Sequence, residues 1–243
     1  MARSLLIRGM IVGIIAAVLV TLFARIVAEP QVDRAIAYEQ SHAAPAHAGM
    51  PAGPELVSRD TQKGGGLLIA LTLYGAAVGG IFALVFAATY GRVGAIGPRT
   101  LSLLLAIGAF VAIALIPALK YPPTPPAVGQ HETVSFRTLA YFAMIAVSLA
   151  SLVIATRIGR GLSHQIGTFN AVLATVALYV AAMTIAQFAL PAINEVPIDF
   201  PATVLWDFRI AALATQAILW VVIGLVFGIL AEKLLRANAP RAR

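Results

Sequence analysis

Residues 67–90 read LLIALTLYGAAVGGIFALVFAATY, an unbroken apolar stretch with no charged side chain. At 1.5 Å per residue, a helix of this length spans about 36 Å, which is enough to cross the ~30 Å hydrocarbon core of a bilayer. Because lipid offers no partner for backbone N–H and C=O groups, the stretch is predicted to be a transmembrane helix.

Similar apolar runs occur along the whole chain, at residues 5–28, 100–119, 138–156, 169–190 and 210–231. The composition agrees, because 11% charged residues against 60% hydrophobic residues cannot coat the surface of a soluble domain. We therefore predict an all-α, polytopic integral membrane helix bundle of about six transmembrane helices. It should form a single membrane domain over residues 1–243, with a polar outer loop at 29–66.

The first apolar run has a competing interpretation as a cleaved signal peptide. Its basic start fits, but the run is longer than the usual 7–15-residue apolar region, and residues 26–28 (IVA) make a poor cleavage site. We expect an uncleaved first helix.

The distribution of Lys and Arg predicts the orientation in the membrane. One set of helix ends carries a single acid, Glu232, and ten of the seventeen basic residues: Arg3, Arg8, Arg92, Arg99, Arg157, Arg160, Lys233, Arg236, Arg241 and Arg243. The opposite ends carry the other seven bases and nine of the ten acids. Both termini are therefore expected to be cytoplasmic, and the net charge of +7 is a topology signal rather than a sign of nucleic-acid binding.

Pairs of glycines four residues apart recur in the spans, at Gly9 and Gly13, at Gly75 and Gly79, and at Gly224 and Gly228. Small residues at this spacing let helices approach closely in lipid. We favour packing within the bundle over a dedicated dimer face.

The predicted spans hold no Asp, Glu, Lys or His at their centres, so they lack the groups of a typical proton relay. Thr175, Tyr179, Met183 and Gln187 fall near one stripe of the fifth span. Such a stripe lines a polar path or bonds to neighbouring helices, and we favour the second. The chain has no cysteine and none of the common catalytic motifs, so we expect no enzyme activity.

The predicted outer face holds the candidate metal ligands. Glu39, His42 and His47 lie in the first loop, where Met50 is a further weak candidate. Imidazole is a good ligand for Co²⁺, Ni²⁺, Cu²⁺ and Zn²⁺, although a flexible loop with incidental histidines is an open alternative. The acids Glu195 and Asp199 on the same face would attract cations, or simply set the topology.

Two arginines begin predicted helices at the outer face, where a cation opposes the helix dipole. We expect loop acids to compensate them, Glu132 for Arg137 and either Asp199 or Asp207 for Arg209.

Two outer segments resemble the CbtA family of probable cobalt transporter subunits. They are residues 117–129 (PALKYPPTPPAVG) with Thr133 and 136–138 (FRT), and residues 194–202 (NEVPIDFPA) with 205–209 (LWDFR), 214–216 (ATQ) and Trp220. The resemblance covers essentially the whole chain. It implies a multi-pass protein of the bacterial cytoplasmic membrane, involved in Co²⁺ uptake with a small one-span, histidine-bearing partner subunit (CbtB-like). The family is often described with five spans, one fewer than predicted here.

Two functions follow as hypotheses. In the first, the chain is a membrane subunit of a divalent-metal uptake system for Co²⁺, which Glu39, His42 and His47 capture, with Glu195 and Asp199 at the entrance. It would hold no permanent cofactor. In the second, it is a non-transporting structural or accessory subunit of a larger membrane complex, which the uncharged spans favour.

Overall fold

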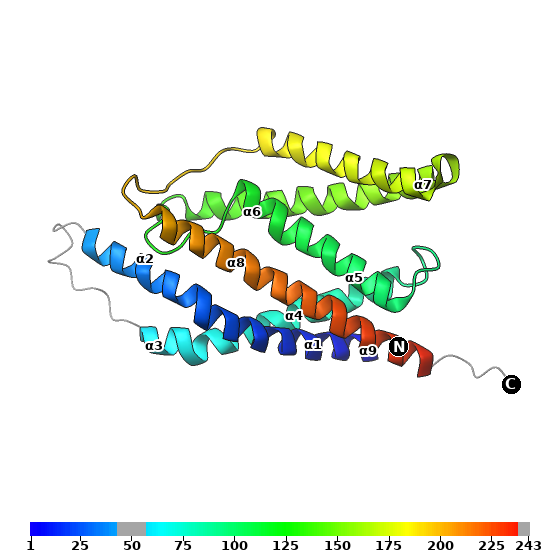
Figure 1. The fold of residues 1–243 in the computed structure, drawn as a ribbon, viewed down its shortest axis with the longest axis horizontal. Helices are drawn as coiled ribbons and strands as arrows, with labels where there is room; N and C mark the ends of the chain where they lie inside the picture. The colour runs from blue at the N-terminus through cyan, green and yellow to red at the C-terminus, as the bar shows by residue number, and fades with distance from the viewer. Residues whose placement is uncertain (43–56, 238–243) are drawn as a thin grey trace. The chain divides into compact units, whose positions relative to one another are not determined.

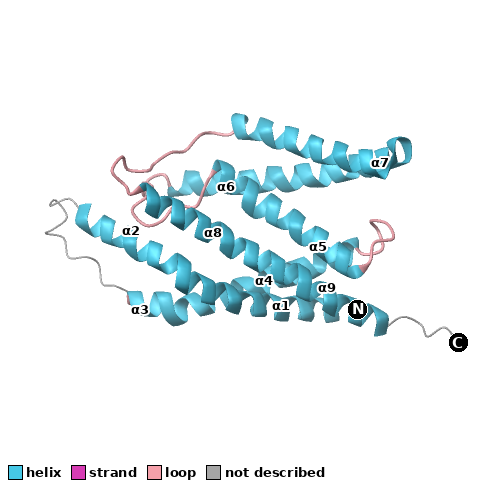
Figure 2. Cartoon of the chain, in the orientation of Figure 1, coloured by secondary structure: helices cyan, strands magenta, loops and turns pink. Residues whose placement is uncertain are grey.

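The computed structural model describes residues 1–42 and 57–237, and these residues are almost entirely helical (Figures 1 and 2). Five of the helices within these ranges are long and apolar enough to cross a membrane. The all-helical, multi-span prediction is therefore confirmed. The five comprise residues Ala2–His42, Arg59–Thr89, Pro98–Lys120, Val134–Ala189 and Ala202–Ala237.

The first helix extends well beyond its apolar run. It consists of α1 (Ala2–Phe23), a π-helical turn η1 (Ala24–Ala28) and α2 (Glu29–His42). Pro30 has no N–H to donate, and the preceding turn widens so that the N–H of Glu29 bonds the carbonyl of Ala24, five residues back. The prediction of a loop from residue 29 onward was therefore wrong for 29–42, because the π turn lets the helix continue through the proline.

The second helix likewise starts inside the predicted loop. It runs through α3 (Arg59–Thr61), η3 (Gln62–Gly66) and α4 (Leu67–Thr89). The third comprises α5 (Pro98–Ala109), η4 (Phe110–Leu115) and α6 (Ile116–Lys120), with Pro117 again just after a π turn. The last comprises α8 (Ala202–Val222), η5 (Ile223–Phe227) and α9 (Gly228–Ala237).

The fourth and fifth predicted spans lie in one 56-residue element, α7 (Val134–Ala189), which is broken at Gly167. Gly167 has φ +78° and ψ 159°, a conformation open almost only to glycine. The two arms of α7 fold back on each other there (Figure 1). The segment 157–166, predicted as a loop, instead continues the first arm, and the reversal is confined to the glycine.

Contacts divide the chain into two compact units. Unit 1 comprises Met1–Ile107, Pro125–Ala127 and Pro201–Arg243, and unit 2 comprises Gly108–Thr124 and Val128–Phe200. The single-domain assignment stays a prediction.

Glycines set the closest packing in unit 1, where α1 lies against α4. Gly13 faces Gly75 and Gly9 faces Gly79, so closely that a Cβ on Gly13 would lie 2.6 Å from the carbonyl carbon of Gly75. The predicted use of these glycines for packing within the bundle is confirmed.

The other glycine pair of unit 1 lies on η5 and α9, against α5. A Cβ on Gly224 would lie 2.7 Å from the Ala106 Cβ, and one on Gly228 would lie 3.1 Å from the Ser102 Cβ. The hydroxyl of Ser102 donates to the carbonyl of Gly224 at 2.7 Å, satisfying a backbone group in the π turn.

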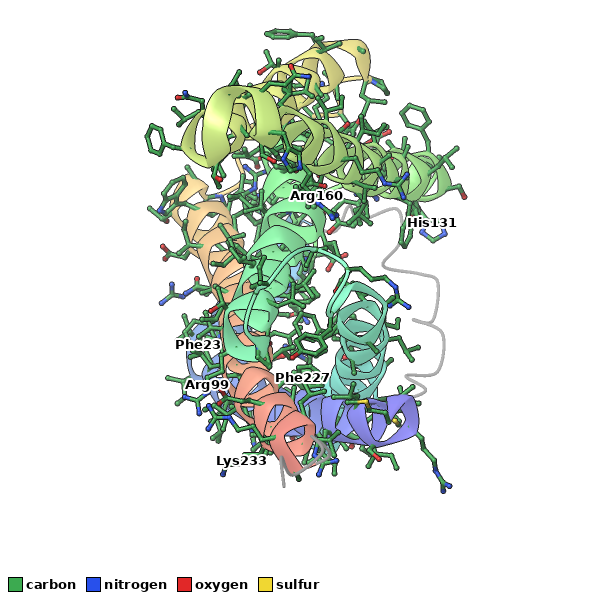
Figure 3. All side chains as sticks on the ribbon, turned by 90° about the vertical axis from the view of Figure 1, so that its right-hand side faces the viewer. Phe23, Arg99, His131, Arg160, Phe227 and Lys233 are labelled. Atoms are coloured by element: carbon green, nitrogen blue, oxygen red, sulfur yellow. The ribbon has the colours of Figure 1, made fainter. Side chains whose placement is uncertain are left out.

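Glu232, the single acid among the predicted cytoplasmic ends, joins two helices of unit 1. Its carboxylate pairs with Arg99 Nε at 2.5 Å and with Arg236 Nη2 at 2.9 Å. Figure 3 looks onto this end of the unit, where Arg99 and Lys233 are labelled. The pairing ties the start of α5 to α9.

Candidate metal-handling residues and the loop contacts

Glu39 and His42 lie one turn apart on the last turns of α2, with both side chains exposed. The His42 ring stacks on Tyr38, with ring centroids 4.0 Å apart, and its Nδ1 lies 2.9 Å from the Tyr38 carbonyl. A carbonyl only accepts, so Nδ1 donates to it in the tautomer that carries the proton there, which leaves the lone pair on Nε2; the Ser41 hydroxyl also lies 2.9 Å from Nδ1. A backbone bond of this kind is a usual way to orient a metal-ligating histidine.

The other predicted ligands do not join Glu39 and His42 in a described site. His47 and Met50 lie outside the described residues. Glu195 and Asp199 belong to unit 2, whereas Glu39 and His42 belong to unit 1. No group of three His, Cys, Asp or Glu side chains able to hold a metal occurs within residues 1–42 and 57–237.

An ion-pair cluster joins α2 to the start of the second helix in unit 1. Arg59 bonds Glu29 through Nη2 and also pairs with Asp33 at 3.2 Å. Lys63 lies 3.9 Å from Asp33 and 3.5 Å from Asp60. Three carboxylates facing two cations give this cluster a net charge of −1, so most of its acidity is neutralised internally. From the sequence, these residues are predicted only to be charged residues of the loop 29–66, without assigned partners.

Glu195 connects the two proline-containing segments of unit 2. Its Oε2 accepts the backbone N–H of Gln130 at 2.7 Å and the hydroxyl of Thr133 at 2.9 Å, and lies 3.5 Å from Arg137 Nε. The N–H of Gln130, then the Thr133 hydroxyl and the Arg137 charge, lower the pKa of Glu195. Glu195 is therefore held as a carboxylate at neutral pH.

The predicted partner of Arg137 was wrong. Glu195 in the far loop, rather than Glu132 in the near one, forms its ion pair. Arg137 also donates through Nη2 to the Gln130 carbonyl at 3.1 Å, and its guanidinium covers Gly129, which has φ +108°. A side chain on residue 129 would occupy the place of the guanidinium, so the glycine is required for the contact.

The polar stripe of α7 faces inward, as predicted for interhelical bonding. The hydroxyls of Tyr179 and Ser148 lie 2.7 Å apart across the two arms, both buried. Tyr179 and Met183 belong to a core cluster with Met144 and Tyr121. The amide of Gln187 donates to the Ile116 carbonyl at 3.5 Å.

The end of α7 is bound to the end of α6 by two further contacts. Lys120 Nζ lies 2.5 Å from the Gln187 carbonyl, and the Tyr121 hydroxyl lies 2.9 Å from the Pro191 carbonyl. A cation at the C-terminal turn of a helix meets carbonyls that have no helical partner. The sequence predicts neither contact.

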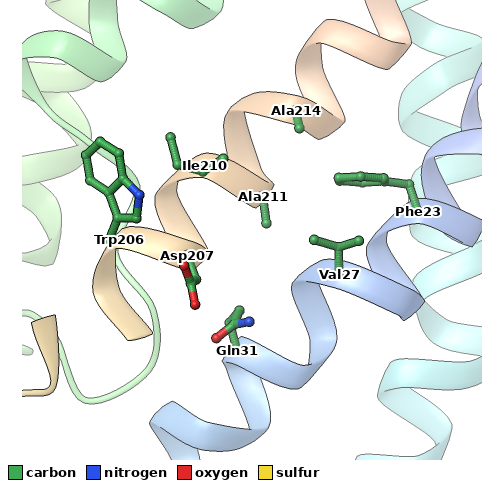
Figure 4. Close-up of a pocket in the computed structure, with 8 residues that line it drawn as sticks. All are labelled: Phe23, Val27, Gln31, Trp206, Asp207, Ile210, Ala211 and Ala214. Carbon is green, nitrogen blue, oxygen red and sulfur yellow. The ribbon is translucent and has the colours of Figure 1, made fainter. Parts of the chain in front are cut away.

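A pocket of about 190 Å³ opens in unit 1 between α8 and the segment running from α1 into α2. Figure 4 shows Asp207 and Gln31 with their polar ends turned toward each other across it. The remaining lining residues are Phe23, Val27, Trp206, Ile210, Ala211 and Ala214.

A family profile described as "Probable cobalt transporter subunit (CbtA)" matches residues 2–232. The chain belongs to the CbtA family. Searches among curated proteins and solved structures give no match. A CbtA-family assignment and five membrane-length helices together make the chain a multi-pass membrane protein of a cobalt transporter family.

The two segments that carry the family resemblance contact each other in unit 2. In this CbtA-family chain, Thr133 and Arg137 from the first segment both contact Glu195 from the second. The two motifs thus meet at the Glu195 carboxylate. These contacts give Thr133, Arg137 and Glu195 a structural role.

Proposed function

We propose that the chain is the membrane-spanning subunit of a cobalt uptake system in the bacterial cytoplasmic membrane. The observation that carries the proposal is the CbtA family match over residues 2–232, which includes all five membrane-length helices except the last residues of the fifth. Co²⁺ is the transported ion, and a small one-span, histidine-bearing subunit is the partner.

The proposed topology has six crossings and cytoplasmic termini. A straight α7 of 56 residues would measure about 84 Å, far beyond one bilayer core, whereas its two arms, 134–166 and 168–189, are each long enough for one crossing. The excess of Lys and Arg at one set of ends supports the orientation.

Single-cysteine labelling tests this topology, because the chain has no cysteine of its own. His131→Cys, before α7, should react with a membrane-impermeant maleimide in intact cells. His164→Cys, near the break in α7, should react only after permeabilisation. Labelling of both positions from the outside would contradict the six-crossing arrangement.

Capture of the ion is assigned to Glu39 and His42 on α2 together with His47, and the entrance to Glu195 and Asp199. The Tyr38 carbonyl beside Nδ1 supports this assignment, because it favours the tautomer with the lone pair on Nε2. Glu195 is already held by three donors, so it would act at the entrance through its charge, which Arg137 partly offsets, rather than as a direct ligand of Co²⁺.

Radioactive cobalt accumulation tests the uptake role in cells that lack other cobalt importers. Accumulation should rise when the chain is expressed with its partner. It should fall in the His42→Ala and His47→Ala double variant and stay unchanged in His131→Ala, a matched control in another loop. If no combination alters accumulation while the proteins reach the membrane, uptake is not their function.

A non-transporting accessory role is the second candidate, and the internal bonding of the spans favours it. The buried hydroxyls of Ser102, Ser148 and Tyr179 all bond within the chain, as does that of Thr21. An accessory subunit would raise the membrane content of its partner. Overexpression of the partner alone would then restore full cobalt accumulation, which a transporting subunit would not allow.

A further inference from the structure

The pocket of unit 1 is polar at one end and apolar at the other. Gln31 and Asp207 lie at the polar end. Phe23 lies eight residues before Gln31, and Ala214 seven residues after Asp207, so each is about 10–12 Å further along its helix. The lining of the pocket therefore changes from polar to apolar along its length.

This gradient runs in the direction of the membrane. Phe23 and Ala214 fall inside the predicted spans 5–28 and 210–231, whereas Gln31 and Asp207 fall just outside them. Trp206 lies beside the polar end with 65% of its surface exposed, and tryptophan is enriched where a membrane protein meets the headgroup layer.

The apolar end argues against a route for the transported metal. Val27, Ile210 and Ala211 complete its wall with Phe23 and Ala214, and none of these side chains carries an oxygen or nitrogen. An ion that left Asp207 in this direction would lose its water without gaining ligands, at a large cost in free energy. A hydrocarbon chain, in contrast, can pack against these apolar side chains without losing any hydrogen bond.

Opposite charges flank the polar end. Asp207 supplies a carboxylate, and Arg34 donates through Nη1 to Gln31 Oε1 at 3.1 Å, which holds a guanidinium within one hydrogen bond of the pocket lining. A ligand that suits both groups would carry a cation to bind Asp207, an anion to bind Arg34 and an apolar chain for the rest of the pocket. A zwitterionic phospholipid has all three parts.

We propose that this pocket binds a membrane phospholipid whose headgroup carries a primary amine, of the phosphatidylethanolamine class. The ammonium group lies at Asp207, the phosphate at Arg34, and one acyl chain enters between Phe23 and Ala214. The rest of the lipid follows the exposed apolar surface beside the pocket, where Ile26 is 74% exposed and Ile210 is 48% exposed.

Native mass spectrometry of the purified full chain tests the proposal, using phosphatidylethanolamine and phosphatidylglycerol with identical acyl chains. The amine lipid should bind about threefold to fivefold more tightly, a modest preference because both protein charges are accessible to solvent. Asp207→Asn should abolish the preference. Asp60→Asn, which alters an exposed acid of the same unit outside the pocket, should retain it.

Two further variants separate the parts of the site. Arg34→Gln should weaken the binding of both lipids, because both carry the phosphate. Ala214→Phe should fill the apolar end and reduce the binding of both. Equal binding of the two lipids by the wild-type chain would overturn the proposal, as would an unchanged preference in Asp207→Asn. Equal binding of the two lipids is the result expected if the pocket instead receives a helix of another protein, because lipid headgroups would then not be recognised there.

Discussion

The carboxylate of Glu195 accepts the backbone N–H of Gln130 at 2.7 Å, although 65 residues separate them. The accepting oxygen also contacts Thr133 and Arg137, so one carboxylate stands at the N-terminus of α7. Thr133 forms no side-chain cap of its own there. A negative charge at this end stabilises a helix, because the first N–H groups have no helical acceptor. Glu195 thus places a negative charge beside the N-terminus of α7 from a distant loop.

Replacement of Glu195 should lower the thermal stability of unit 2. Glu195→Gln keeps an oxygen for Gln130 and Thr133 but loses the charge facing Arg137, so it should lower the melting temperature less than Glu195→Ala. Thermal unfolding in detergent measures this. Glu132→Gln serves as the control because Glu132 does not form the ion pair with Arg137. Equal melting temperatures for all four proteins would contradict a stabilising role of Glu195.

The Glu195 contribution should also depend on pH. Since its pKa is lowered in the folded protein, its stabilisation is complete above the ordinary value of 4.5 and is lost as the pH falls through the lower folded value. The difference in melting temperature between wild type and Glu195→Gln should therefore be constant at pH 6–8 and shrink below about 4.5. A difference that grows on acidification would show that another group dominates.

Addition of one methyl group at the α1–α4 contact should destabilise unit 1. Gly13→Ala would place Cβ 2.6 Å from the backbone of Gly75, which cannot move without separating the helices. We expect a loss of about 1–3 kcal/mol in the free energy of unfolding. Gly80→Ala is the matched control, because its Cβ would meet only the flexible side chains of Met10 at 3.2 Å and Leu6 at 3.4 Å. Similar losses for both variants would argue against backbone contact as the cause.

The Ser148–Tyr179 hydrogen bond should couple the two arms of α7 energetically. Because both hydroxyls are buried, Ser148→Ala and Tyr179→Phe each leave one group unpaired, and the double variant removes both. A double-mutant cycle should give a coupling energy of about 0.6 kcal/mol, and no more than ~1.7. Thr184→Ala is a suitable control, since that exposed hydroxyl bonds only its own helix. A coupling of zero would mean that the bond contributes nothing.

Substitution of Gly167 should strain the reversal of α7. At φ +78° and ψ 159°, Gly167→Ala should cost about 1–3 kcal/mol. Gly161→Ala lies in the adjoining helical segment with open space around its Cβ, so it should be neutral or stabilising. Chemical unfolding of both variants compares the positions. Equal changes in the free energy of unfolding for the two variants would show that the backbone conformation of Gly167 is not the cause.

Much of the fold is predictable because lipid imposes a simple rule on each segment separately. Residues 67–90 and the other apolar runs must form helices, whatever they later contact. The positions at which the helices begin and end are harder to predict. The extension of the first helix to His42 depends on a π turn that accommodates Pro30, and the hydrophobic pattern contains no sign of it.

The apolar pattern alone predicts a membrane protein built from helices, because twenty-residue apolar runs have no other stable state in lipid. The spacing of Gly9 and Gly13 also predicts a close approach of helices, since only small residues permit it. The pairing of Arg137 with Glu195 instead of Glu132, and the position of Asp207 opposite Gln31, are visible only in the folded chain. These partners are distant along the chain, and charge alone does not choose among several loop acids. The folding of the chain decides which acid lies near Arg137 and which lies near Gln31.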